Sequence, residues 1–215
     1  MIDEHRRRIG IFGGSFDPPH IGHVQVARDV ADALLLDEVL WVPAREPPHK
    51  VGAELTAPPS IRLKMARAAA HDDPRFRVSD MELRRPAPSY TIDTLRSVRS
   101  GKAGSGTDLF LIMGFDQYRD FASWRAPDEI RNLATLAVMD RGGEGLGDTD
   151  DGDREGVVSV PVRRVDVSST EVRARLGRGD DVSDLVPPAV ERIIREEGLY
   201  RDDGRPPEDC YIPRS

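Results

Sequence analysis

The chain has 215 residues, of which 38% are hydrophobic and 32% are charged, and its formal net charge is −7. This length suits one sizeable domain, and the alternation of apolar and charged segments is typical of a globular protein. The acidic balance argues against a nucleic acid as the main partner, because duplex-binding proteins carry a basic excess.

Two further features concern the compartment in which the chain works. The single cysteine, Cys210, excludes an intramolecular disulfide and fits a reducing environment. No apolar stretch approaches the roughly 20 residues needed to cross a bilayer, and the first residues lack the apolar core of a signal peptide. We therefore predict a cytoplasmic protein with no membrane partner. The sequence leaves open whether it is a monomer or a small homo-oligomer.

Strand-like and helix-like stretches alternate along the chain. Strands are predicted at residues 8–13, 38–43, 75–79, 109–114, 135–140 and 159–165. Helices are predicted at residues 21–36, 60–70, 91–99, 128–133, 170–176 and 187–196, with Ser60 as the N-cap of the second helix. Strands that are apolar throughout fit a parallel sheet covered on both faces. The predicted fold class is therefore α/β, a doubly wound, Rossmann-like parallel sheet.

Two segments stand apart from this α/β domain, which is expected to span residues 1–200. Residues 142–156 are rich in Gly and Asp without apolar periodicity, and we predict a mobile surface loop. They lack the ligand spacing of an EF-hand calcium loop, so no metal site is predicted there or elsewhere. Residues 201–215 are expected to form a polar C-terminal tail.

The stretch IGIFGGSFDPPHIGH, residues 9–23, joins the first strand to the first helix. Gly13 and Gly14 let the backbone approach a phosphate closely, and the start of the helix supplies free N–H groups. His20 and His23 are three residues apart, so both imidazoles can face the crevice at the end of the strand. Neither G-x-G-x-x-G nor the Walker pattern is present. On these residues alone three interpretations remain open: a phosphate or nucleotide site, a pair of metal ligands, or a purely structural turn.

A second candidate stretch, SSTEVR, covers residues 168–173. The pair Ser168 and Glu171 has the spacing of a helix capping box, which needs no ligand. The hydroxyls, the free N–H groups and Arg173 in the first turn are equally suited to phosphates. One feature can serve both purposes.

These two stretches resemble the paired signatures of nucleotidyltransferases that carry an H-x-G-H motif. GGSFDPPHIGH is similar to the first signature, and residues 168–173 are similar to the second, I-S-S-T-x-[IV]-R, with Val167 in place of Ile. The resemblance implies a single nucleotidyltransferase domain in which His20, His23 and Arg173 are catalytic and the two histidines contact the ATP phosphates. It also implies that ATP is bound by Gly13, Gly14, Ser15, Phe16, Gly114, Asp116, Ser168, Ser169 and Thr170.

Four further stretches concern the acceptor. EPPHK (46–50), PSYTIDTL (88–95), FASW (121–124) and EEGLY (196–200) are similar to stretches of bacterial nicotinate-nucleotide adenylyltransferases. This resemblance, over about residues 8 to 200, implies transfer of AMP from ATP to nicotinate mononucleotide in NAD biosynthesis, giving nicotinate adenine dinucleotide and pyrophosphate. It implies Mg²⁺ carried with ATP. It places the acceptor against Asp17, His49, Lys50, Tyr90, Thr91 and Trp124.

Specific roles follow for some of these residues. Tyr90 or Trp124 can stack on the pyridine ring, and in the family backbone N–H groups near the Tyr-Thr pair read the carboxylate. Phe115 departs from the family, which usually has a small residue there.

Other functions remain open at this point. The same fold can take nicotinamide mononucleotide or phosphopantetheine as acceptor. A nucleotide-sensing module would bind ATP without turnover. An interaction domain would use residues 142–156 as its contact arm.

Overall fold

The computed structural model describes residues 6–46, 56–101, 106–140 and 155–201. Its strands are β1 (Arg7–Gly14), β2 (Glu38–Pro43), β3 (Phe76–Val78), β4 (Thr107–Gly114), β5 (Thr135–Asp140) and β6 (Val157–Pro161). Its helices are α1 (Ile21–Ala33), α2 (Pro59–Ala69), α3 (Thr91–Ser100), α4 (Phe115–Arg119), the 3₁₀ helix η2 (Phe121–Ser123), α5 (Pro127–Leu133), α6 (Ser169–Arg178) and α7 (Pro188–Glu196).

The strands form one six-stranded sheet in the order β3-β2-β1-β4-β5-β6. Every neighbouring pair is parallel. The chain first winds outward from β1 through β2 to β3, and then returns to β4 and winds the other way. The predicted doubly wound parallel sheet is therefore confirmed. Its switch point lies between the carboxyl ends of β1 and β4, where open α/β sheets bind their ligands.

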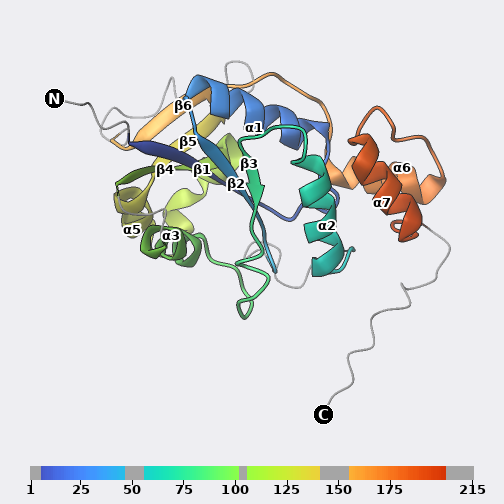
Figure 1. Cartoon of the computed structure of the whole chain (residues 1–215), viewed down its shortest axis with the longest axis horizontal. Helices are drawn as coiled ribbons and strands as arrows, with labels where there is room; N and C mark the ends of the chain where they lie inside the picture. Colours follow the sequence, from blue (N-terminus) through green and yellow to red (C-terminus); the bar gives the residue numbers. More distant parts are fainter. Residues whose placement is uncertain (1–5, 47–55, 102–105, 141–154, 202–215) are drawn as a thin grey trace, which may run out of the picture.

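Helices cover both faces of the sheet, so its central strands are apolar on both sides. Successive side chains of a strand point to opposite faces. Accordingly Ile9 and Ile11 of β1 pack in the core layer of α3 and α5, whereas Phe12 packs in the layer of α1 and α2. Figure 1 shows α1 and α3 on opposite sides of the sheet, with α7 beside α2. No helix within the described ranges is long and apolar enough to span a bilayer.

Most predicted elements are present, with shifted ends. The first helix stops at Ala33, three residues earlier than predicted, and the last strand covers 157–161 instead of 159–165. Ser60 is not an N-cap, because α2 begins at Pro59 with Pro58 as its cap; proline suits the first helical position since its missing N–H is not needed there. The short helices α4 and η2 were not predicted.

Some predictions concern residues outside the described ranges. These are His49, Lys50, positions 142–154 of the Gly- and Asp-rich segment, and the tail from residue 202.

Candidate active site

A cavity of about 810 Å³ opens at the carboxyl ends of β1 and β4. It lies at the switch point of the sheet and is bordered by the starts of α1, α3, α4 and α6. Its lining includes most of the predicted site residues: Gly13, Gly14, Ser15, Phe16, His20, His23, Tyr90, Thr91, Gly114, Asp116, Trp124, Ser168 and Ser169. Segments that the sequence assigned separately to ATP and to the acceptor therefore share one cavity.

Three predicted residues within the described ranges are not part of this lining: Asp17, Thr170 and Arg173. Arg173 lies just outside it, where Nη1 donates a hydrogen bond to the carbonyl oxygen of Asp17 at 2.7 Å. Nη2 approaches the Thr170 hydroxyl at 3.4 Å. Arg173 is thus held against the loop between β1 and α1, which carries the histidines.

The two histidines lie against each other at the start of α1. Their ring centroids are 3.7 Å apart, and His20 is the N-cap residue of the helix. Nδ1 of His23 accepts a hydrogen bond from the backbone N–H of His20 at 3.1 Å. In the neutral ring the proton is then on Nε2, an assignment that follows from this hydrogen bond. His23, which lines the cavity, is therefore a ring of defined tautomer with Nε2–H as its donor.

An aromatic cluster supports the His23 ring from below. Phe16 meets that ring edge-on with centroids 5.2 Å apart, and Trp41 packs against Phe16 at 5.0 Å. The ring centroid of Phe12 lies 5.6 Å from that of Phe16 and 5.1 Å from that of Trp41. Because Phe16 and Trp41 are almost completely buried, the His23 ring packs against the close-packed core of the protein.

The start of α6 closes one side of the cavity. Ser168 is its N-cap and accepts a hydrogen bond from the N–H of Glu171 at 3.1 Å, which confirms one half of the predicted capping box. The Glu171 carboxylate instead accepts from Arg175. The Ser169 hydroxyl donates to the carbonyl of Pro18 at 2.9 Å, which ties α6 to the β1–α1 loop.

The start of α3 lies at another side. Tyr90 is its N-cap and Thr91 its first helical residue, so the first N–H groups of the helix, which have no helical acceptor, lie beside the cavity. The Arg125 guanidinium covers the Tyr90 ring at 4.6 Å, and the Trp124 ring lies 5.6 Å from that of Phe121. This end combines aromatic faces with anion-binding groups.

Sequence analysis missed Arg125 and Glu82, which also line this end of the cavity. Glu82 is buried and accepts a hydrogen bond from the Thr94 hydroxyl, and burial raises the pKa of its carboxyl. Arg125 directly follows Trp124, a predicted site residue, and this position could have indicated that Arg125 also lines the cavity. Nothing in the sequence distinguishes Glu82 from a surface residue.

The end of β4 supplies the remaining wall. Gly114 caps α4, and its N–H donates to Gln117 Oε1 at 3.0 Å. Asp116 is exposed in the first turn of α4. Phe115 is half-buried and packs against the α3–α5 core layer while also lining the cavity. The departure at this position therefore places an aromatic ring in the wall.

Asp17, predicted to bind the acceptor, is not part of the cavity lining. It is 3% exposed, and its carboxylate accepts hydrogen bonds from Thr56 N (2.8 Å), Ala57 N (3.0 Å) and the Tyr200 hydroxyl (2.7 Å). Its acceptor oxygens are used inside the protein, and it supports the loop that carries the histidines.

Arg62 of α2 was not predicted at all, although it completes this support. It is fully buried and donates to the carbonyls of Ser15 (2.8 Å), Ala44 (2.7 Å), Arg45 (3.2 Å) and Ala57 (3.2 Å). Burial lowers the pKa of its guanidinium, whereas the nearby Asp17 carboxylate raises it. Asp17 and Arg62 thus fix the ends of β1 and β2 and the entry to α2.

Among the described residues, no group of three or more His, Cys, Asp or Glu side chains could hold a metal ion. The donors that line the cavity include imidazoles, hydroxyls, the guanidinium groups of Arg125 and Arg163, and helix N-termini. Such a set is suited to an anion.

The sequence matches the Cytidylyltransferase-like family model over residues 11–175. A probable nicotinate-nucleotide adenylyltransferase of Thermus thermophilus is 45% identical over 194 residues, covering 90% of this chain and 100% of the relative. A probable nicotinate-nucleotide adenylyltransferase of Shouchella clausii is 40% identical over 196 residues, covering 91% and 98%.

Solved structures show the same fold. The Plasmodium falciparum nicotinic acid mononucleotide adenylyltransferase complexed with NaAD superimposes with a TM-score of 0.72 at 20% identity, covering 90% of this chain and 97% of that one. The putative nicotinate-nucleotide adenylyltransferase of Vibrio parahaemolyticus gives a TM-score of 0.62 at 23% identity, covering 91% and 96%.

Proposed function

This chain belongs to the cytidylyltransferase-like family and, within it, to the nicotinate-nucleotide adenylyltransferases; from this premise we propose that it transfers the adenylyl group of ATP to nicotinate mononucleotide. An oxygen of the acceptor's phosphate bonds to the α-phosphorus of ATP. The bond between that phosphorus and the oxygen bridging to the β-phosphorus breaks, and pyrophosphate leaves. The other product is nicotinate adenine dinucleotide, an intermediate of NAD biosynthesis.

One observation carries the proposal beyond the family likeness. The histidine pair and the start of α3 line a single cavity, so a nucleotide held at the first and a pyridine nucleotide held at the second can meet. A cavity of about 810 Å³ falls within the usual range for small-molecule sites. Tyr90 and Trp124 supply flat faces for a pyridine ring, and the N-terminus of α3 supplies donors for its carboxylate.

The reaction does not require a general base. The second pKa of a phosphate monoester is about 6, so the attacking phosphate is mostly dianionic at neutral pH. The protein's task is to orient two anions and to neutralise charge that develops at the α-phosphate. His20 and His23 would donate to phosphate oxygens, and Arg173 would bind the triphosphate from its place against the Asp17 carbonyl.

ATP is proposed to enter as its Mg²⁺ complex. The described residues offer no carboxylate cluster for the ion, and Mg²⁺ characteristically keeps several water ligands alongside substrate phosphates. The ion would accordingly be held by the triphosphate and water, with the protein binding the phosphates around it.

The test of the function is pyrophosphate release by the purified protein with ATP and Mg²⁺. Nicotinate mononucleotide, nicotinamide mononucleotide and phosphopantetheine are supplied in parallel. We expect efficient release with the first and at least tenfold lower kcat/KM with the second, because a neutral amide leaves the N–H donors at α3 less well satisfied. Phosphopantetheine should give none.

The other outcomes separate the alternatives. Equal use of the two mononucleotides would keep the enzyme class but remove the selectivity for the acid. ATP binding without release with any acceptor would favour a nucleotide-sensing module. If deletion of residues 142–156 abolished the protein's biological function, the chain would be an interaction domain that uses this segment as its contact arm.

Gly22 allows a separate prediction about His20. A Cβ at position 22 would lie 3.0 Å from Nδ1 of His20 and 3.0 Å from Cγ1 of Val167. Gly22→Ala should therefore displace the His20 ring, lowering kcat at least tenfold and the free energy of unfolding by about 1–3 kcal/mol. Steady-state kinetics and urea titration would measure the two effects. An unchanged kcat would show that the position of the His20 ring is unimportant.

We also propose that the reaction takes place in the cytoplasm, without nucleic acid or membrane partners. The acidic net charge and the single cysteine support this placement.

A further inference from the structure

Asp17 lies where four separate parts of the chain meet. It belongs to the β1–α1 loop, three residues before His20, and its carboxylate holds the backbone N–H groups of Thr56 and Ala57. Its carbonyl oxygen accepts from Arg173. The fourth contact comes from the C-terminal end of the domain, where the Tyr200 hydroxyl donates to Oδ1 at 2.7 Å. One residue thus links both groups of proposed catalytic side chains to the C-terminal segment.

Tyr200 is held in this position against its own backbone preference. Its φ is 62°, in the left-handed region that bulky residues rarely adopt. Such a conformation persists only where the surrounding structure imposes it. The side chain is 8% exposed, and burial followed by the Asp17 carboxylate raises the pKa of the phenol. Tyr200 therefore keeps its proton and acts as a donor to Asp17.

The backbone between Asp17 and the start of α1 is restricted, so the position of Asp17 determines that of His20. Pro18 and Pro19 follow Asp17 directly, and proline fixes φ. The Pro18 carbonyl is held by the Ser169 hydroxyl, and the N–H of Ile21 donates to the carbonyl of Leu185 at 3.0 Å. A shift of the Asp17 peptide would therefore change both the start of α1 and the carbonyl on which Arg173 rests.

We infer that Tyr200 is a positioning residue for adenylyl transfer: through its hydrogen bond to Asp17 it sets the placement of His20 and Arg173. It does not line the cavity, so its effect on the reaction is indirect. This inference rests on the proposed function, because it assigns Tyr200 a part in the same phosphate site.

Tyr200→Phe tests the inference, since it removes one hydroxyl and keeps the ring. We expect kcat with ATP and nicotinate mononucleotide to fall about tenfold at temperatures well below the melting point, because small misplacements of reacting groups carry large rate losses. The ring signals of His20 and His23 in ¹H–¹³C NMR, assigned with single-histidine variants, should also shift. A residue that only stabilised the fold would lower the melting temperature and leave kcat and these signals unchanged.

Two matched controls separate positioning from general loosening. Tyr118 is also 8% exposed, but its buried hydroxyl has no hydrogen-bond partner among the described residues, so Tyr118→Phe should keep kcat within about twofold. Lys64→Met removes the 2.7 Å ion pair with Glu197, which joins α2 to the residue after α7. Exposed pairs contribute little, and this variant should also keep kcat.

The remaining outcomes are decisive. Wild-type kcat and unmoved histidine signals in Tyr200→Phe would overturn the inference, as would an equal loss in both controls. If the wild-type protein releases no pyrophosphate, the proposed function fails, and the histidine signals still decide whether Tyr200 positions the loop.

Discussion

Replacing His23 with asparagine should lower kcat for pyrophosphate release by about 10²–10³-fold while leaving the fold intact. Removal of a single preorganised donor to developing charge has effects of this size in other enzymes. The asparagine side-chain oxygen can take over the acceptor role of Nδ1, which receives the N–H of His20 at 3.1 Å. The donor lost is Nε2–H, which belongs to a ring that lines the cavity.

The comparison with His23→Ala separates the two nitrogens. Alanine removes both the donor and the acceptor, so kcat should fall as far as in the asparagine variant. The free energy of unfolding should fall by about 1 kcal/mol more, because the N–H of His20 loses its partner at the start of α1. Kinetics at saturating substrate and urea titration would measure these effects. An asparagine variant with more than a tenth of wild-type kcat would exclude His23 as a phosphate donor.

Arg62→Met should have the largest effect on stability, lowering the free energy of unfolding by about 3–5 kcal/mol. Methionine fills similar space but removes the donors that Arg62 supplies to four carbonyls, and it removes a cation near the buried Asp17 carboxylate. Urea titration would measure the loss. A loss below 1 kcal/mol would show that the buried guanidinium is not needed for the fold.

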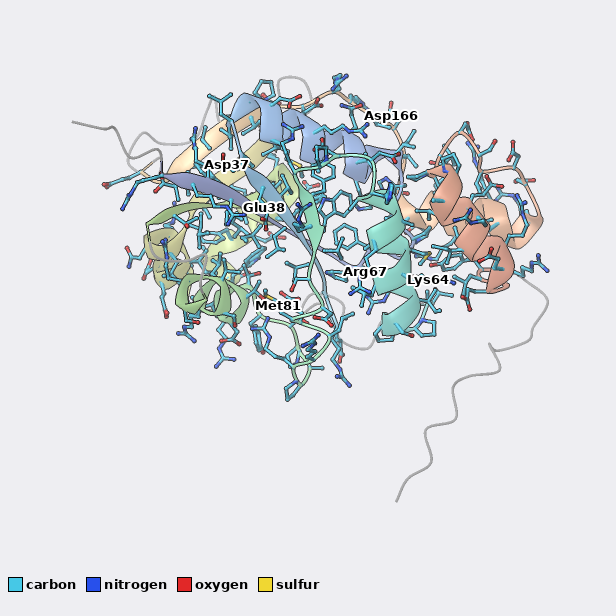
Figure 2. The ribbon with its side chains drawn as sticks, in the orientation of Figure 1. Asp37, Glu38, Lys64, Arg67, Met81 and Asp166 are labelled. Carbon is cyan, nitrogen blue, oxygen red and sulfur yellow. The ribbon has the colours of Figure 1, made fainter. Side chains whose placement is uncertain are left out.

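Two control variants accompany this prediction: one at another arginine of α2, and one with a different substitution at position 62. Figure 2 shows Arg67, an exposed residue of α2, and Arg67→Met should change stability by no more than about 0.5 kcal/mol. Arg62→Lys keeps the charge beside Asp17, but one ammonium cannot span four carbonyls. Its loss should therefore be intermediate, and it gives a measurable variant if Arg62→Met does not fold.

Apolar periodicity and turn residues were sufficient to predict the sheet and most helices. Strand 135–140 was predicted with its observed ends because an apolar run is bounded there by polar residues. Helix α4 was missed because five residues span little more than one turn, too few to show periodicity. The start of α2 was misplaced because the serine after two prolines was given the capping role that Pro58 holds.

Most of the predicted site residues line the cavity, whereas the buried residues that support it could not be predicted. The motif containing Asp17 does not reveal on which side of the loop its carboxylate lies, and the structure turns it inward. An arginine in an amphipathic helix is normally exposed, as Arg67 is, so nothing in the sequence indicated that Arg62 is buried. Tyr200 is separated from its partner by 183 positions, and local patterns carry no information over such a distance.

That separation also sets an order of events during synthesis. A ribosome adds about 5–20 residues per second, so Tyr200 follows Asp17 by roughly 10–40 s. Until then the β1–α1 loop of the nascent chain lacks one of the contacts that hold it. A chain cut short before residue 200 could still form much of the sheet, yet it would lack that anchor. The hydrogen bond between the two residues can therefore form only after residue 200 has been synthesised.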